Sequence, residues 1–178
     1  LLNKNFDIIE CVGVLHHMKN PFMGWKKLSS ILNHGGLMFV GLYSEIARRN
    51  ISSMRKIIKR LNILPTKNNI IKFRNDLIYN DKKRCENFVY WSDFYNFSEF
   101  RDLFFHVQEH CFSISKIKSY IHRLGFNFCG FENDNAKIEF LKNNKNNDLF
   151  DLEKWEEFEI NNKDVFSGMY QFWIQKIK

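Results

Sequence analysis

The sequence predicts an α/β domain on two observations. Two apolar segments, residues 6–15 and 37–43, flank a stretch with helical periodicity. Two strands on either side of one helix form a β-α-β unit, so we expect them to be parallel with a right-handed crossover. Two more apolar segments, 126–132 and 169–176, read as strands that follow a long helical region. Strands and helices in this order predict one α/β sheet.

The first unit has local signals at both ends of its helix. Residues 6–12 lie in a run of isoleucine and valine that is typical of a strand buried on both faces. Asn20 suits the N-cap, and Pro21 suits the first helical position, where its missing N–H would have no partner in any case. The Gly35-Gly36 pair is expected to end this helix, immediately before the second strand.

The middle of the chain, residues 44–125, is predicted to be a helical insertion. Apolar spacing and capping residues predict these helices: 45–62, 68–79, 98–110 and 113–124. Residues 81–96 show little periodicity and are expected to form a loop. Gly125 should end the last helix, and two shorter helical stretches, 136–142 and 151–158, are expected between the third and fourth strands.

Composition indicates a globular protein. The 178 residues are 44% hydrophobic and 26% charged, which is ordinary for that class. None of the four cysteines forms a CxxC pair, so we expect reduced thiols and a cytoplasmic location. No apolar run reaches the roughly 18 to 20 residues that cross a membrane, so no membrane partner is expected. Because Phe6 already lies in a predicted element, we expect the chain to be part of a longer protein.

The net charge of +7 raises the question of nucleic-acid binding. The densest basic stretch is RRNISSMRKIIKR, residues 48–60. Met54, Ile58 and Leu61 follow helical spacing on its opposite side, which is typical of an amphipathic helix with a solvated basic face. We therefore expect no nucleic-acid partner.

The segment FDIIECVGVLHHMKNP places two histidines directly after a predicted strand. In open α/β sheets, ligands bind beyond the carboxyl ends of the strands. Gly13 lets the backbone approach a ligand closely, and an imidazole can act as a ligand or as a general base near neutral pH. His16 and His17 are therefore candidate functional residues. In the alternative reading, one of them caps the next helix or packs against Trp25.

The second polar constellation is RDLFFHVQEH. On a helix, Asp102, His106, Glu109 and His110 would form one stripe at i, i+4, i+7 and i+8. His106, Glu109 and His110 also match the HxxEH pattern, in which two histidines one turn apart bind zinc. Two other readings are a solvated polar face and a polar wall over a substrate pocket. In that last role, Arg101 would bind a carboxylate or a phosphate.

Together these motifs resemble the C-terminal half of class I S-adenosylmethionine-dependent methyltransferases. FDIIECVGVLHHMKNP resembles the fourth strand and its loop, and GWKKLSSILNHGGLMFVGLYSE resembles the next helix and the fifth strand. FNFCGFE and MYQFWIQK resemble the sixth and seventh strands. The resemblance is strongest to bacterial domains with a VLHH loop and an RDLxFHxQEH segment, sometimes fused to tetratricopeptide repeats. It implies half of a doubly wound, Rossmann-like sheet in the order 4-5-7-6, with a helical insertion after the second strand.

The resemblance also implies the roles of individual residues. S-adenosylmethionine would be the cofactor, and no metal is implied. Its methionine end would be lined by Cys11, Val12 and Gly13. The catalytic residues, near the methyl group, would be His16 and His17. The acceptor would be bound by Tyr43, Arg101, His106, Glu109 and His110.

The chain lacks GxGxG, the family's cofactor-binding loop, which we expect upstream. Residues 1–178 would then be a partial methyltransferase domain with three parts: a β-α-β core (1–43), a helical insertion that covers the substrate (44–125), and a closing strand pair with a helical connection (126–178). The predicted function is methyl transfer to an unidentified small molecule or protein side chain. The upstream half of the domain would be the partner, and the fragment alone would be inactive. The alternatives are a non-catalytic methyltransferase-like interaction domain and an HxxEH metal-dependent hydrolase.

Overall fold

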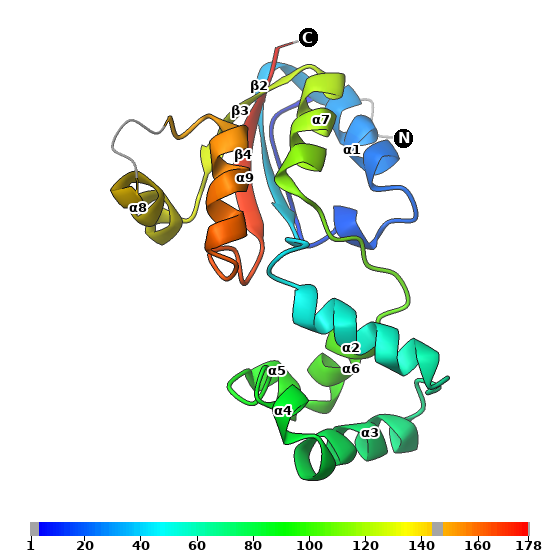
Figure 1. Cartoon of the computed structure of the whole chain (residues 1–178). Coiled ribbons are helices and arrows are strands. Elements are labelled where there is room, and N and C mark those ends of the chain that lie inside the picture. Colours follow the sequence, from blue (N-terminus) through cyan, green and yellow to red (C-terminus); the bar gives the residue numbers. More distant parts are fainter. Residues whose placement is uncertain (1–3, 144–147, 178) are drawn as a thin grey trace. The chain divides into compact units, whose positions relative to one another are not determined.

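The computed structural model describes residues 4–143 and 148–177, and these form two compact units (Figure 1). The first unit consists of two segments of the chain: one runs up to Arg48, and the other begins at Gln108. The second unit is Arg49–Val107. The separate helical unit is therefore shorter than the expected insertion of 44–125, because residues 108–125 belong with the sheet.

A four-stranded sheet forms the centre of the first unit. Its strands lie in the order β1 (Phe6–Val12), β2 (Leu32–Leu42), β4 (Tyr170–Lys176) and β3 (Phe126–Phe131). β1 and β2 are parallel, and β4 is antiparallel to both of its neighbours. The parallel first pair and the central position of the last strand agree with the expected pairing. Whether these are strands four to seven of a larger sheet stays a prediction.

The connection from β1 to β2 contains the 3-10 turn η1 (Leu15–His17) and helix α1 (Pro21–Ser30). Asn20 caps α1 as predicted, because its side chain accepts a hydrogen bond from the Met23 N–H at 3.2 Å. The predicted end of the helix at Gly35-Gly36 is wrong, since both glycines lie within β2. A Cβ atom on Gly36 would come within 2.9 Å of the Asp7 carbonyl oxygen, so close approach of β1 explains this glycine.

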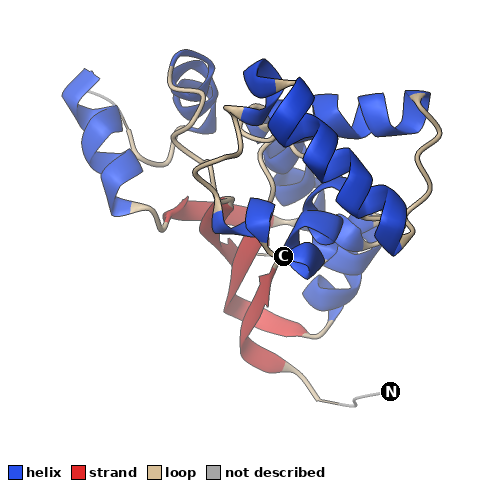
Figure 2. Cartoon of the chain, turned by 90° about the horizontal axis from the view of Figure 1, so that it is seen from below, coloured by secondary structure: helices blue, strands red, loops and turns tan. Residues whose placement is uncertain are grey.

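The remaining helices of this unit are α7 (Ile114–Leu124), α8 (Asp134–Asn143) and α9 (Leu152–Asn161). The predicted limits of α7 are confirmed: Ser113 caps its start, and Gly125 ends it with φ +71°. One face of the sheet packs against apolar residues of the helices, and this core includes Trp25, Met38, Val40, Ile117, Trp155 and Phe172. The helices of this unit lie on that face (Figure 2).

The opposite face of the sheet carries exposed apolar side chains. Ile8 is 58% exposed, and the stacked rings of Phe39 and Trp173 lie 4.9 Å apart. β1 is also an edge strand, with β2 as its only partner in the described chain. The prediction that β1 is buried on both faces is therefore wrong for this chain, because only Cys11 of this strand is fully buried.

The second unit is helical. Its helices are α2 (Arg49–Arg60), α3 (Lys67–Asn80), α4 (Lys82–Cys85), α5 (Ser92–Tyr95) and α6 (Phe97–Phe105). The segment 81–96, expected to be a loop, contains α4 and α5, which bury Cys85 and Phe94 in the core of this unit. Across the described ranges of the chain, no helix is both long and apolar enough to cross a membrane.

Candidate functional site

The candidate site lies at the carboxyl ends of β1 and β2. After β1, the chain turns at Gly13, which has φ +75° and donates its N–H to the Gly41 carbonyl oxygen at 3.4 Å. The η1 turn then presents His16 and His17, and Tyr43 directly follows β2. Because β1 and β2 are parallel, these two strand ends meet at one edge of the sheet.

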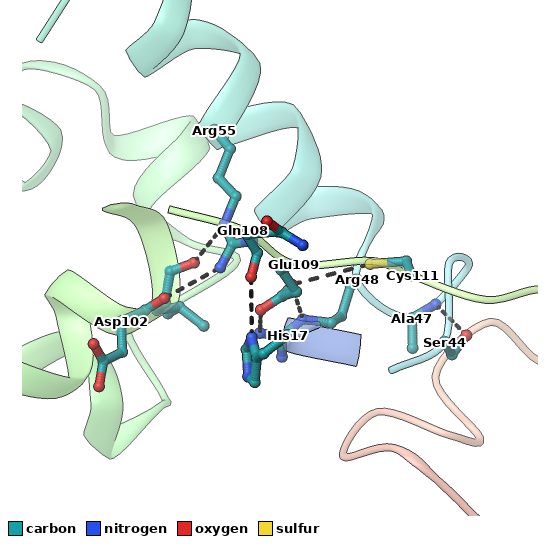
Figure 3. Close-up of polar contacts among 10 residues, drawn as sticks. His17, Ser44, Ala47, Arg48, Arg55, Asp102, Gln108, Glu109 and Cys111 are labelled. Carbon is teal, nitrogen blue, oxygen red and sulfur yellow. Dashed lines mark hydrogen bonds and ion pairs between the residues drawn. The ribbon is translucent and has the colours of Figure 1, made fainter. Parts of the chain in front are cut away.

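The two histidines and Tyr43 form an aromatic cluster. His16 is fully buried, and its ring centroid lies 4.0 Å from that of Tyr43, with the planes inclined by 30°. The half-buried His17 meets His16 edge-on at 4.3 Å. Nδ1 of His17 lies 3.1 Å from the Gln108 carbonyl oxygen (Figure 3). Neither histidine is the N-cap of α1, since Asn20 has that role.

A buried ion pair lies beside this cluster. Arg48 donates Nε to Oε1 of Glu109 at 3.0 Å and Nη2 to Oε2 at 3.1 Å (Figure 3). The two side chains are only 10% and 3% exposed. The Arg48 guanidinium carbon lies 3.5 Å from the centroid of the Tyr43 ring. Sequence reasoning missed Arg48 because it begins the basic stretch that was interpreted as a solvated face.

Glu109 reaches this position because residues 106–111 are not helical. The Phe112 N–H donates to the Tyr43 carbonyl oxygen at 2.9 Å, and the His110 N–H donates to the His16 carbonyl oxygen at 2.8 Å. The predicted helix through residue 110 is wrong: α6 ends at Phe105, and His106 turns away with ψ 133°. Pairing with the two strand ends thus takes the place of the helical hydrogen bonds that a longer α6 would make.

The predicted polar stripe therefore does not form. Asp102 and His106 belong to the second unit, whereas Glu109 and His110 belong to the first. The HxxEH reading requires two histidines one helical turn apart, and this helix is absent at residues 106–110. Within residues 4–143 and 148–177, no group of three or more histidine, cysteine, aspartate or glutamate side chains is arranged to hold a metal ion.

The three residues expected to contact the cofactor differ in accessibility. The Cys11 side chain packs in the core, and burial raises the pKa of its thiol. Val12 is 37% exposed, and a Cβ atom added to Gly13 would meet nothing within 4 Å. The backbone at Gly13 and the Val12 side chain are thus accessible. The Cys11 thiol is not.

A second buried polar cluster was not predicted from the sequence. Ser44 donates its hydroxyl to Oε1 of Glu159 at 2.5 Å, and the Tyr170 hydroxyl donates to Oε2 at 2.6 Å. Burial raises the pKa of Glu159, and the two hydroxyl groups offset this only in part. The signal that could have revealed it is Glu159 on the inward face of α9, one turn after Trp155.

The fold is thus an α/β sheet with a parallel first pair, an antiparallel closing pair and a polar site at its carboxyl edge. No protein-family model matches the chain. It is 27% identical to the uncharacterized protein syc1184_c of Synechococcus sp. over 147 residues, 71% of this chain and 32% of that protein.

Two solved structures are similar to the chain. PKMT2 from Rickettsia typhi matches with a TM-score of 0.64 and 15% identity, over 98% of this chain and 37% of that one. PKMT2 in complex with AdoHcy matches with a TM-score of 0.61 and 16% identity, over 99% and 36%. The chain therefore shares its fold with part of PKMT2, and it spans about a third of the length of these proteins.

Proposed function

We propose that the chain is the C-terminal, substrate-side half of a class I S-adenosylmethionine-dependent methyltransferase domain. Its fold agrees along almost its full length with part of PKMT2. A structure of that protein contains AdoHcy, the product of S-adenosylmethionine. The acceptor is an unidentified small molecule or protein side chain.

The observation that carries this proposal is the aromatic cluster of His16, His17 and Tyr43 at the shared carboxyl edge of β1 and β2. This edge is where open α/β sheets bind their ligands. Val12 and Gly13 would contact the methionine end of the cofactor. Bound there, S-adenosylmethionine would supply an electrophilic methyl group.

His17 is the better candidate for the general base. Its Nδ1 lies at hydrogen-bonding distance from the Gln108 carbonyl oxygen, which can only accept. This contact favours the tautomer with hydrogen on Nδ1, so Nε2 is the basic nitrogen. His17 is half-buried, whereas His16 is fully buried and stacks on Tyr43. His17 would take the acceptor's proton. His16 would keep the side chains at the carboxyl edge of β1 and β2 in position.

We also propose that the upstream half of the same domain covers the open side of the sheet. The edge of β1, the exposed Ile8 and the half-buried Phe39 and Trp173 form an unpartnered apolar surface in the described chain. The missing GxGxG loop would lie in that half. The isolated chain should therefore bind S-adenosylmethionine very weakly or not at all.

For the residues of the second unit, we keep the proposed role in acceptor binding. Arg101 is exposed and can bind a carboxylate or a phosphate. His106 is the C-cap residue of α6, five positions after Arg101. A cytoplasmic location remains part of the proposal, supported by four cysteines that are all free thiols.

A non-catalytic interaction domain with this fold is the second candidate. Transfer of a labelled methyl group by the intact protein separates the two. His17→Ala should lower turnover by roughly 10² to 10⁴-fold and leave cofactor affinity nearly unchanged. His122→Ala, at an exposed position on α7, is the matched control. Full turnover in the His17 variant would show that the histidine is structural, and no turnover in any form would favour the second candidate.

A further inference from the structure

We infer that Arg48 and Glu109 form a positioning pair, which holds the His16 imidazole in place through the Tyr43 ring. This inference deepens the proposed methyl-transfer site and rests on it for its functional meaning. Its structural part, that the ion pair positions the His16 ring, can be tested without measuring activity.

The proposed link consists of three planar groups: the Arg48 guanidinium and the His16 ring each lie against the Tyr43 ring. The guanidinium of Arg48 lies over one side of the Tyr43 ring at 3.5 Å, and the His16 ring lies 4.0 Å from the same ring centroid. A cation over a tyrosine face is attracted by the ring quadrupole, and the attraction grows when the pair is shielded from water. Arg48 is 8% exposed and His16 is fully buried. The Tyr43 ring therefore has little freedom to tilt.

Glu109 sets the orientation of this stack. Both of its carboxylate oxygens accept from Arg48, one from Nε and one from Nη2. Such a two-pronged bond fixes the plane of the guanidinium as well as its position. Because the carboxylate of Glu109 fixes the guanidinium in this way, Glu109 acts through Arg48 in this proposal. We therefore assign it this role in place of the acceptor contact that the sequence had suggested.

Stability alone is a weak explanation for the pair. Removing two charges from water is costly, and apolar side chains of similar volume often replace buried ion pairs without loss of stability. The pair does tie together two chain segments far apart in sequence. Arg48 is the last residue of the sheet unit before the helical unit, and Glu109 lies just after the chain returns. The Phe112 N–H bond to the Tyr43 carbonyl joins the same two segments.

The test follows the ring signals of His16 by NMR in the full chain with labelled histidines. The His16 signal is assigned by its loss in His16→Asn. Glu109→Gln and Arg48→Met should shift and broaden this signal, because the Tyr43 ring current then acts from a changed position. Arg48→Lys should do the same, since lysine keeps the charge but lacks the flat fork. Lys118→Met, which removes the exposed ion pair with Glu153 in the same unit, should leave the signal unchanged.

A double variant tests whether the effect of Glu109 on His16 passes through Tyr43. Tyr43→Leu should displace the His16 signal, and adding Glu109→Gln should then change it little further, because the two sites act in one chain. Arg48→Lys is the mildest change, and it supplies the readout if a stronger variant fails to fold. An unchanged His16 signal in a folded Arg48→Lys or Glu109→Gln chain, with only a lower melting temperature, would overturn the inference.

Turnover in the intact protein separates this inference from the proposed function. If methyl transfer occurs, the pair variants should lower kcat with little change in KM for S-adenosylmethionine. If the wild-type protein transfers no methyl group, the proposed function fails, and the NMR result still decides the positioning role.

Discussion

Replacing Glu159 tests whether its carboxyl group anchors the end of β2. In Glu159→Leu, the hydroxyls of Ser44 and Tyr170 lose their acceptor, and both residues are fully buried. An unsatisfied buried polar group costs about 1 to 3 kcal/mol, so the leucine variant should lose roughly 2 to 6 kcal/mol. That is a large part of the about 5 to 15 kcal/mol typical of a folded domain. Glu159→Gln keeps an acceptor oxygen and should lose much less at neutral pH.

The dependence of folding stability on pH gives a second test of Glu159, with a predicted direction. Burial raises the pKa of Glu159, so the folded chain holds this proton more tightly than the unfolded chain. The stabilisation is fully present below the unfolded-state value of 4.5 and is lost as pH rises through the higher folded-state pKa. Glutamine carries no such proton. The stability of wild type relative to Glu159→Gln should therefore fall as pH rises.

Urea unfolding of both chains, at steps from about pH 4.5 to 8, measures this difference. Burial also raises the pKa of Tyr170, so its hydroxyl remains a donor throughout that range. Parallel stability curves for wild type and Glu159→Gln would refute the reasoning, because the carboxyl group would then have the same pKa in both states.

Three further predictions follow from packing and from the proposed site. Gly41→Ala should cost about 1 to 3 kcal/mol in chemical unfolding, because its Cβ would lie 2.6 Å from Cγ1 of Val12, whereas Gly168→Ala has open space and should cost little; equal costs would contradict this packing. Ile8→Lys should be tolerated in the isolated chain but should destabilise the intact protein, and equal melting shifts in both would argue against an upstream cover on this side of the sheet. Arg101→Ala should raise the KM for the acceptor with kcat nearly unchanged, and a fall in kcat alone would exclude a simple binding role.

The parts of the fold that were predicted correctly depend on local signals. Asn20 and Pro21 start α1 through side-chain and backbone geometry that the sequence carries directly. Ser113 and Gly125 delimit α7 in the same way. Apolar runs located the four strands of the sheet, the β-α-β pattern predicted that the first two are parallel, and the resemblance supplied the strand order.

The errors arise where distant residues decide the local structure. The predicted helix extends to residue 110, but the N–H groups of His110 and Phe112 bond to residues 94 and 69 positions earlier in the sequence, at the ends of β1 and β2. The Arg48–Glu109 pair depends on this pairing and so could not be inferred from spacing. The exposure of Ile8 is likewise a property of the sheet edge, which the composition of the strand does not reveal.

The central claim is that the carboxyl ends of β1 and β2 form a methyl-transfer site. The most direct measurement is photochemical cross-linking of methyl-labelled S-adenosylmethionine to the intact protein, followed by peptide mapping with and without excess AdoHcy. The account predicts label within residues 11–43 that AdoHcy displaces, and little label on the isolated chain. An intact protein in which that segment carries no displaceable label would contradict it.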